Sequence, residues 1–271
     1  MSTLPGSRGR IFHERWLPDG DVHGAVVLIH GYGEHLGLYD ALARRFAAHG
    51  HAVHAFDLIG HGRSDGDRAL IESWDDVVDD ARRLAVLARA QHPGVPLTVV
   101  GHSGGALAAA LLALRSPATA DGLVLSGAPL HSQDWIHDWL ALGAPETEAT
   151  DPTEVLSTHP EYVHALTHDP LTWKGGFRRE TLLAVVAAWP EIAGGLAAGR
   201  PDIPVLVVHG ESDPVVPVEH AHRTASRLPD ARIRTFPDDL HDVLNEHDRD
   251  TVHETVVAFA DEVMASQAVP G

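Results

Sequence analysis

The residue best suited to nucleophilic chemistry is Ser103, at the centre of the pentapeptide Gly101–Gly105, GHSGG. The pentapeptide follows the apolar, β-branched run Leu97–Val100 and precedes the alanine- and leucine-rich segment Ala106–Leu114, which is typical of a helix. This strand, turn and helix order predicts a nucleophile elbow, a strained turn that pushes a serine hydroxyl out of the backbone. The glycines two residues before and after the serine fit this prediction, because a Cβ there would collide with the neighbouring strand and helix.

A serine hydroxyl becomes a good nucleophile only when a base accepts its proton and a third group orients that base. In a strand-based elbow of this kind the chain order is serine, acid, histidine. Asp213 is the predicted acid because it follows the apolar run Val205–Val208, and His241 is the predicted base because it precedes the last helical segment. Asp57 comes before the serine, and no carboxylate directly follows the apolar run Gly122–Leu125.

Attack on a carbonyl also requires hydrogen-bond donors for the oxyanion that forms. The backbone N–H of Gly104, directly after the serine, is the first predicted donor. The backbone N–H of Tyr32 is the second, because glycines on both sides of Tyr32 allow the chain to turn that amide inward. An ordinary strand-to-helix turn is the alternative interpretation of the segment His30–Gly33.

Short apolar strands alternate with helical segments along the chain. This alternation predicts an α/β fold with a mostly parallel sheet covered by helices on both faces, which would position these residues. The expected strands are Ile11–Trp16, Ala25–Ile29, Ala52–Phe56, Leu97–Val100, Gly122–Leu125, Val205–Val208 and Arg232–Thr235. The expected helices are Tyr39–Ala48, Trp74–His92, Gly104–Arg115, Ala221–Leu228 and Arg249–Ala265. Because ligands bind at the carboxyl ends of such strands, the polar clusters that follow them are expected to meet in one crevice.

Residues 129–200 interrupt this alternation, contain no β-branched strand run and hold four of the six tryptophans. The spacing of Trp135, Ile136, Trp139 and Leu140 predicts one apolar helical face. We therefore expect a helical cap at 129–200, inserted into a core formed by 1–128 and 201–271. Each aromatic side chain there has two possible roles, to hold the cap together or to line an acyl-binding tunnel. A cap needs residues of both kinds.

Composition excludes several function classes. A formal charge of −18 argues against nucleic-acid binding, and the absence of cysteine excludes disulfides and cysteine-ligated metals. The N-terminal segment has no apolar signal region, so a cytoplasmic protein is expected. Although the chain has 21 histidines, none has convincing metal-ligand spacing, so we expect no metal or cofactor and no effect of chelators.

Taken together, these segments resemble the α/β-hydrolase superfamily, and within it the monoacylglycerol lipase and lysophospholipase-like serine hydrolases. The resemblance lies in His30–His35, Asp57–Gly66, Gly101–Gly105, His168–Leu171, His209–Val216 and His241–Glu246, and so covers nearly the whole chain. It implies a Ser103/Asp213/His241 triad that cleaves an ester bond in a small acyl ester or lipid-like substrate entering under a mobile cap. Residues expected to bind substrate are Glu34, Leu38, Trp135, Trp139 and Trp173. The apolar face of the cap is expected to contact membranes transiently.

The chain departs from this family at three places. Gly104 stands where the family usually has a bulky residue, so more space and flexibility are expected beside the serine. Leu38 stands where an Arg often precedes the Tyr, which weakens the case for glycerol esters. The cap resembles the family only at His168–Leu171, and the cap is the part of such enzymes that sets substrate choice.

Other reactions on the same scaffold are acyl transfer, amide hydrolysis and carbon–carbon bond hydrolysis. A non-catalytic binding protein of the same fold is disfavoured because no triad member is missing.

Overall fold

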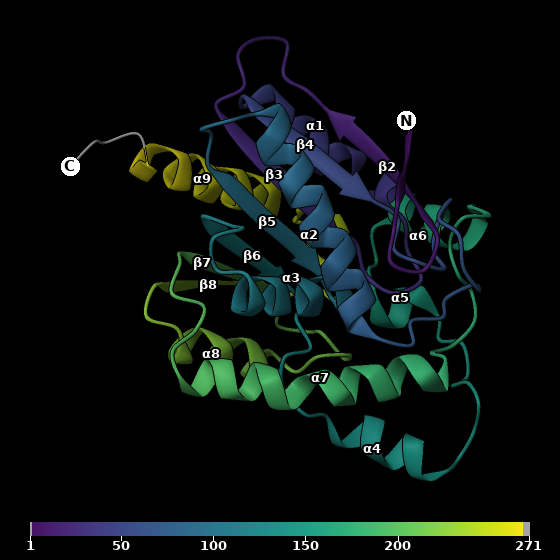
Figure 1. Ribbon diagram of the computed structural model, residues 1–271. Helices are drawn as coiled ribbons and strands as arrows, with labels where there is room; N and C mark the ends of the chain where they lie inside the picture. Colours follow the sequence, from purple (N-terminus) through teal and green to yellow (C-terminus); the bar gives the residue numbers. More distant parts are fainter. Residues whose placement is uncertain (1, 268–271) are drawn as a thin grey trace.

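The structure, a computed structural model, describes residues 2–267 and contains one eight-stranded sheet in the order β1-β2-β4-β3-β5-β6-β7-β8 (Figure 1). The strands are β1 (Ser2–Pro5), β2 (Arg10–Trp16), β3 (Gly24–Ile29), β4 (His51–Phe56), β5 (Leu97–His102), β6 (Gly122–Ser126), β7 (Val205–Gly210) and β8 (Ala231–Phe236). All pairs from β4 to β8 are parallel, whereas β1 and β2 pair antiparallel at one edge. The predicted fold class is therefore confirmed.

Helices cover both faces of this sheet. They are α1 (Asp40–Ala48), α2 (Trp74–Gln91), α3 (Gly104–Arg115), α4 (Asp134–Ala141), α5 (Pro152–Val155), α6 (Pro160–His168), α7 (Arg179–Ala197), α8 (Val218–Arg227) and α9 (Arg249–Gln267), with short 3-10 turns at Leu36–Tyr39 and Val243–Asn245. Apolar side chains of α1 and α9 pack on one face, and those of α2, α3, α7 and α8 pack on the other. The central parallel strands are buried on both faces, which explains why they are continuous apolar runs.

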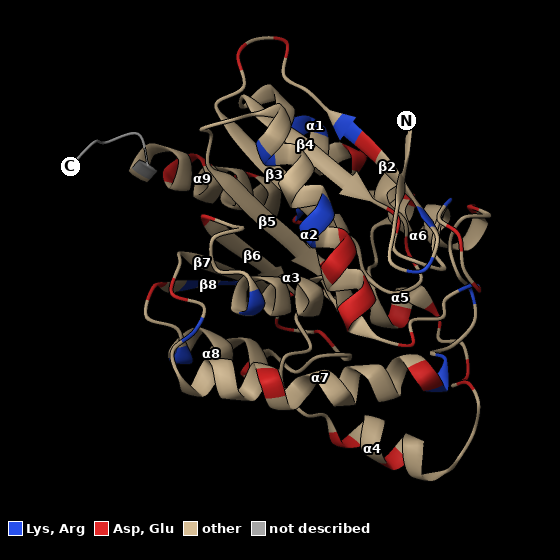
Figure 2. Cartoon of the chain, viewed as in Figure 1, with Lys and Arg blue, Asp and Glu red and all other residues tan. Residues whose placement is uncertain are grey.

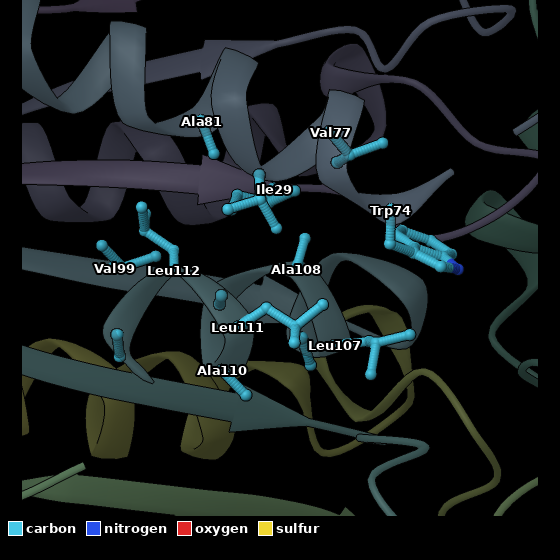
Figure 3. Close-up of a cluster of buried hydrophobic side chains, with 14 of the residues drawn as sticks. Ile29, Trp74, Val77, Ala81, Val99, Leu107, Ala108, Ala110, Leu111 and Leu112 are labelled. Atoms are coloured by element: carbon cyan, nitrogen blue, oxygen red, sulfur yellow. The ribbon is translucent and has the colours of Figure 1, made fainter. Parts of the chain in front are cut away.

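Helix α3 lies in the larger of the two cores, between α2 and α7. Its face toward α2 is built from alanines and leucines, and Figure 3 shows Leu107, Ala108 and Leu111 near Ile29 of β3 and Trp74 of α2. Burying α3 on nearly all sides keeps its first turn in place. That turn begins directly after Ser103.

All seven predicted strands and five predicted helices form, with ends that differ by a few residues. Strand β1, which is short and largely exposed at the sheet edge, was not predicted. Strands of this kind lack the alternating apolar pattern that makes a strand recognisable, because they bury little surface.

Residues 129–200 contain the helices α4 to α7 and no strand beyond one isolated bridge between Glu146 and Arg178. The predicted helical face at 135–140 forms α4, with Ile136 buried. Helix α7 is long and apolar enough to cross a membrane by length and composition, but its side chains Trp189 and Ile192 belong to the main core. We therefore interpret α7 as a helix packed on the core. The division at 129 and 200 remains a prediction.

Candidate active site

Ser103 occupies a strained turn between β5 and α3, with φ 51° and ψ −120°. This conformation is rare for a residue with a side chain and marks a functional turn. A Cβ on Gly105 would overlap the carbonyl oxygen of Ile29 in β3, and one on Gly101 would overlap the backbone of α3 at Gly105. The steric reason predicted for both glycines is therefore present in the structure.

The three predicted triad residues lie together at the carboxyl ends of the strands. Ser103 Oγ is 2.9 Å from His241 Nε2, and His241 Nδ1 is 2.7 Å from Asp213 Oδ2. An ionised carboxylate only accepts hydrogen bonds, so Nδ1 carries the proton and Nε2 is free to accept the serine hydroxyl hydrogen. This arrangement can remove a proton from Ser103 during attack.

The loop after β7 holds Asp213 as an anion. Its Oδ1 accepts the backbone N–H groups of Val215 at 2.8 Å and Val216 at 3.0 Å, and His209 Nε2 is 3.1 Å from Oδ2. Burial alone would raise the pKa of Asp213, but the facing imidazoles of His241 and His209 hold that pKa well below its usual range. The carboxylate therefore stays charged at every pH at which the protein would be assayed.

His241 itself is fully enclosed, with a relative exposure of 2%. Burial alone would lower its pKa, but the negative charge of Asp213, with smaller effects of Asp242 and Glu34, raises the pKa above its ordinary value. These charges favour the imidazolium that forms when the histidine accepts a proton.

Of the two predicted oxyanion donors, Gly104 directly follows the serine and Tyr32 lines the same cavity as Ser103. Within residues 2–267, neither the amide of Tyr32 nor that of Gly104 donates a hydrogen bond to another protein group. Gly104 is the first residue of α3, where an N–H has no partner within the helix, so both amides are available to a ligand oxygen. The Gly104 amide also belongs to the first turn of α3, where the helix dipole favours negative charge.

Close packing of neighbouring side chains explains the glycine before Tyr32. A Cβ on Gly31 would lie 2.9 Å from the ring of His102, 3.0 Å from Glu34 Oε2 and 3.2 Å from the Cβ of Ser103. Gly33, on the other side, has φ +80°. Both conditions favour glycine, which agrees with the loop expected from the sequence.

A mostly apolar cavity of about 630 Å³ opens from Ser103 under residues of the 129–200 segment. Of the residues predicted to bind substrate, Trp135, Trp139, Trp173 and Glu34 line it. Leu38 does not, because its side chain packs on the core cluster beside α1. The expectation that Leu38 contacts substrate is therefore corrected.

Glu34 lies at the cavity wall, but internal partners occupy its carboxylate. Tyr39 Oη and the amide of Gly31 both donate to Oε2 at 2.7 Å, and Tyr162 of α6 donates to Oε1. Burial and the nearby Asp242 raise the pKa of Glu34 to about 7. Tyr162 was not predicted as a site residue because its neighbours in the sequence show only the pattern of an amphipathic helix.

Glu34, His102 and Asp242 form a buried cluster whose possible ligand atoms lie within 4.8 Å of one another. The cluster is hydrogen-bonded by protein groups: His102 Nδ1 is 3.2 Å from Ser126 Oγ, and the amide of Asn245 donates to Asp242 at 2.9 Å. The three residues therefore have partners without a cation.

The space expected beside Gly104 is filled. A Cβ on Gly104 would lie only 2.5 Å from Cη2 of Trp74, whose indole is 3% exposed. The expectation of a roomier site at Gly104 is therefore wrong. A large residue on α2 occupies the volume that a larger residue after the serine would need.

Fold and site together define a serine hydrolase with an α/β-hydrolase architecture. Residues 20–248 match the model of the family described as serine aminopeptidase, S33. The chain belongs to this family of α/β-hydrolases.

Named relatives agree with this assignment. The chain is 33% identical over 264 residues to a monoacylglycerol lipase of Mycolicibacterium smegmatis, covering 92% of both chains. It is 26% identical to the mouse monoglyceride lipase, covering 90% of this chain and 84% of that one.

Among solved structures, a monoacylglycerol lipase of Paleococcus ferrophilus matches with a TM-score of 0.77 and 24% identity, covering 93% of this chain and 99% of that one. A thermostable carboxyl esterase of Bacillus coagulans matches with a TM-score of 0.81 and 20% identity, covering 97% and 98%. These two likenesses support the fold.

Proposed function

We propose that the protein hydrolyses carboxylic esters of lipid-like acyl chains, monoacylglycerols among them, through an acyl-enzyme at Ser103. The observation that carries this proposal is the hydrogen-bonded chain from Ser103 through His241 to Asp213 at the base of an apolar cavity. Relatives named monoacylglycerol lipase support the choice of substrate class.

In the proposed mechanism His241 accepts the proton of Ser103 as Oγ attacks the ester carbonyl. The amides of Tyr32 and Gly104 hydrogen-bond to the oxyanion. His241 then donates that proton to the departing alcohol, which leaves an acyl ester on Ser103. Water, deprotonated by the same imidazole, releases the acid and restores the serine.

The cavity is large enough to hold a long acyl chain. Its volume of about 630 Å³ lies within the range of small-molecule sites, and its walls include Trp135, Trp139 and Trp173. We propose that the 129–200 segment acts as the cap over this acyl site. A panel of monoacylglycerols, lysophospholipids and simple esters of increasing chain length would define the preferred substrate.

The nucleophile can be tested with Ser103→Ala and a matched serine change. Ser103→Ala is expected to abolish turnover of nitrophenyl esters and labelling by a fluorophosphonate. Ser212→Ala removes an exposed hydroxyl that donates to the carbonyl of Pro237, and should retain full activity. Substantial turnover or labelling in purified Ser103→Ala would refute the proposal.

We also propose that the cap contacts lipid surfaces transiently while substrate enters. Trp135, Leu142 and Leu183 are exposed by 38%, 77% and 46%, and Figure 2 shows long stretches of α7 without charged residues, whereas α4 carries acidic ones. Leu142→Glu is expected to weaken sedimentation with phosphatidylcholine vesicles while hydrolysis of a short ester stays unchanged. Equal sedimentation of both proteins would contradict the proposal. The cytoplasmic location stays a proposal from the sequence.

A further inference from the structure

The loop that carries the proposed Tyr32 donor is joined to the 129–200 segment at four successive residues. The carbonyl of Gly33 accepts the amide of Trp173 at 2.8 Å, and His35 Nε2 is 3.2 Å from Asp169. Tyr162 donates to Glu34, as described above. The fourth connection comes from the side chain of Tyr32.

The phenol of Tyr32 bridges two points of the segment 173–178, which we call the cap strap. Tyr32 Oη donates to the carbonyl of Gly176 at 3.1 Å and accepts the amide of Arg178 at 3.2 Å. The ring stacks on Phe177 with centroids 4.7 Å apart and planes at 25°, and meets His61 edge-on at 5.4 Å. Burial raises the pKa of Tyr32 to about 12, so the phenol keeps its proton.

The position of this residue gives its side chain an unusual role. Tyr32 lies between two glycines, so its backbone amide is flanked by residues with wide conformational freedom. An oxyanion donor stabilises a transition state only if it is held in place before the reaction. The backbone groups of the two glycines are held by Glu34 and Trp173, and the side chain of Tyr32 adds a restraint on the residue that carries the amide itself.

We propose that the Tyr32 phenol is a positioning residue that fixes its own backbone amide in the oxyanion hole through the cap strap. The proposal rests on the proposed role of that amide. Trp173, Gly176 and Phe177 also line the cavity, so the segment that touches the acyl chain is the one that holds the donor. The cap therefore contributes to the rate of the chemical step as well as to substrate binding.

Tyr32→Phe tests the proposal because it removes both hydrogen bonds of the phenol and keeps the stacked ring and the amide. With a short nitrophenyl ester, kcat is expected to fall about tenfold while KM changes less than twofold, a partial loss of the 10²- to 10³-fold effect of an oxyanion donor. Affinity for a trifluoromethyl ketone, which mimics the tetrahedral intermediate, should fall by a similar factor. Inhibition by a fatty acid product should stay the same.

Thr158→Val is the matched control. The Thr158 hydroxyl also joins the 129–200 segment to the core, at 3.2 Å from Glu246, but it lies apart from the oxyanion loop. This variant should retain kcat. Phe177→Leu, which removes the stacked ring, should lower kcat by an intermediate factor.

The proposal is overturned if Tyr32→Phe has a kcat within twofold of the unmodified protein, or if Thr158→Val loses as much. A failure of the proposed function would look different. If the proposed function fails, the unmodified protein will resist fluorophosphonate labelling. If only this inference fails, the unmodified protein and Tyr32→Phe will be labelled at equal rates.

Discussion

Replacing Gly104 with alanine is a sharp test of how the elbow is packed. The new methyl would lie 2.5 Å from Cη2 of Trp74, well inside van der Waals contact, so the indole or the helix must move by about an ångström. Trp74 is 3% exposed, and its side chain lies between its own helix α2 and helix α3, as Figure 3 shows. Neighbouring side chains therefore resist movement of the indole.

Two effects of this substitution oppose each other. Overpacking a well-filled core costs ~1–3 kcal/mol, whereas replacing glycine by alanine in a helix gains at most ~1 kcal/mol. Gly104 is the first residue of α3, so the helical gain is smaller there. We expect a net loss of ~1–2 kcal/mol in the free energy of unfolding, or about 2–4 °C in Tm for a chain of this length. Because the Gly104 amide is a proposed oxyanion donor, kcat should fall about tenfold.

A double-mutant cycle gives the decisive measurement. Trp74→Phe shortens the aromatic side chain and makes room for the methyl, so Gly104→Ala should be less harmful in that background, with a coupling of ~1 kcal/mol. Denaturant unfolding of the four proteins and ester hydrolysis would measure both effects. If Gly104→Ala is as stable as the unmodified protein, or if the two changes simply add, the packing argument is wrong.

Three further predictions concern charge and pH. Asp213→Asn should lower kcat about 10⁴-fold with little change in fold, because the asparagine favours the wrong tautomer of His241. Ester hydrolysis by the purified variant would measure this loss of kcat. Asp242→Asn should move the acid limb of kcat/KM to lower pH, because less negative charge near His241 makes its protonated form less stable; a limb that moves upward would contradict the charge assignment. Burial lowers the pKa of His30 and of His61 to about 3, so the unfolded chain binds more protons below pH 6.5 and stability must fall with acid. The loss should reach about 2 kcal/mol for each histidine by pH 5, and unfolding midpoints that stay constant from pH 7 to pH 5 would refute it.

The parts of the site that the sequence predicted share a local steric or chemical cause. Gly101 and Gly105 identify the elbow because the turn itself excludes a Cβ at those positions. Asp213 and His241 could be chosen because each follows a strand whose carboxyl end must face the crevice. The spatial meeting of these residues follows from parallel strand order.

Tertiary structure alone decided which volumes are filled and which side chains reach the cavity. Trp74 comes from α2, about thirty residues before Gly104, and no local pattern links the two positions. Leu38 turns to the core and Tyr162 reaches Glu34 from a different helix. A backbone turn restricts the residue types at adjacent positions, so it can be recognised in the sequence. Long-range contacts depend instead on how whole helices pack, which all of their side chains determine together.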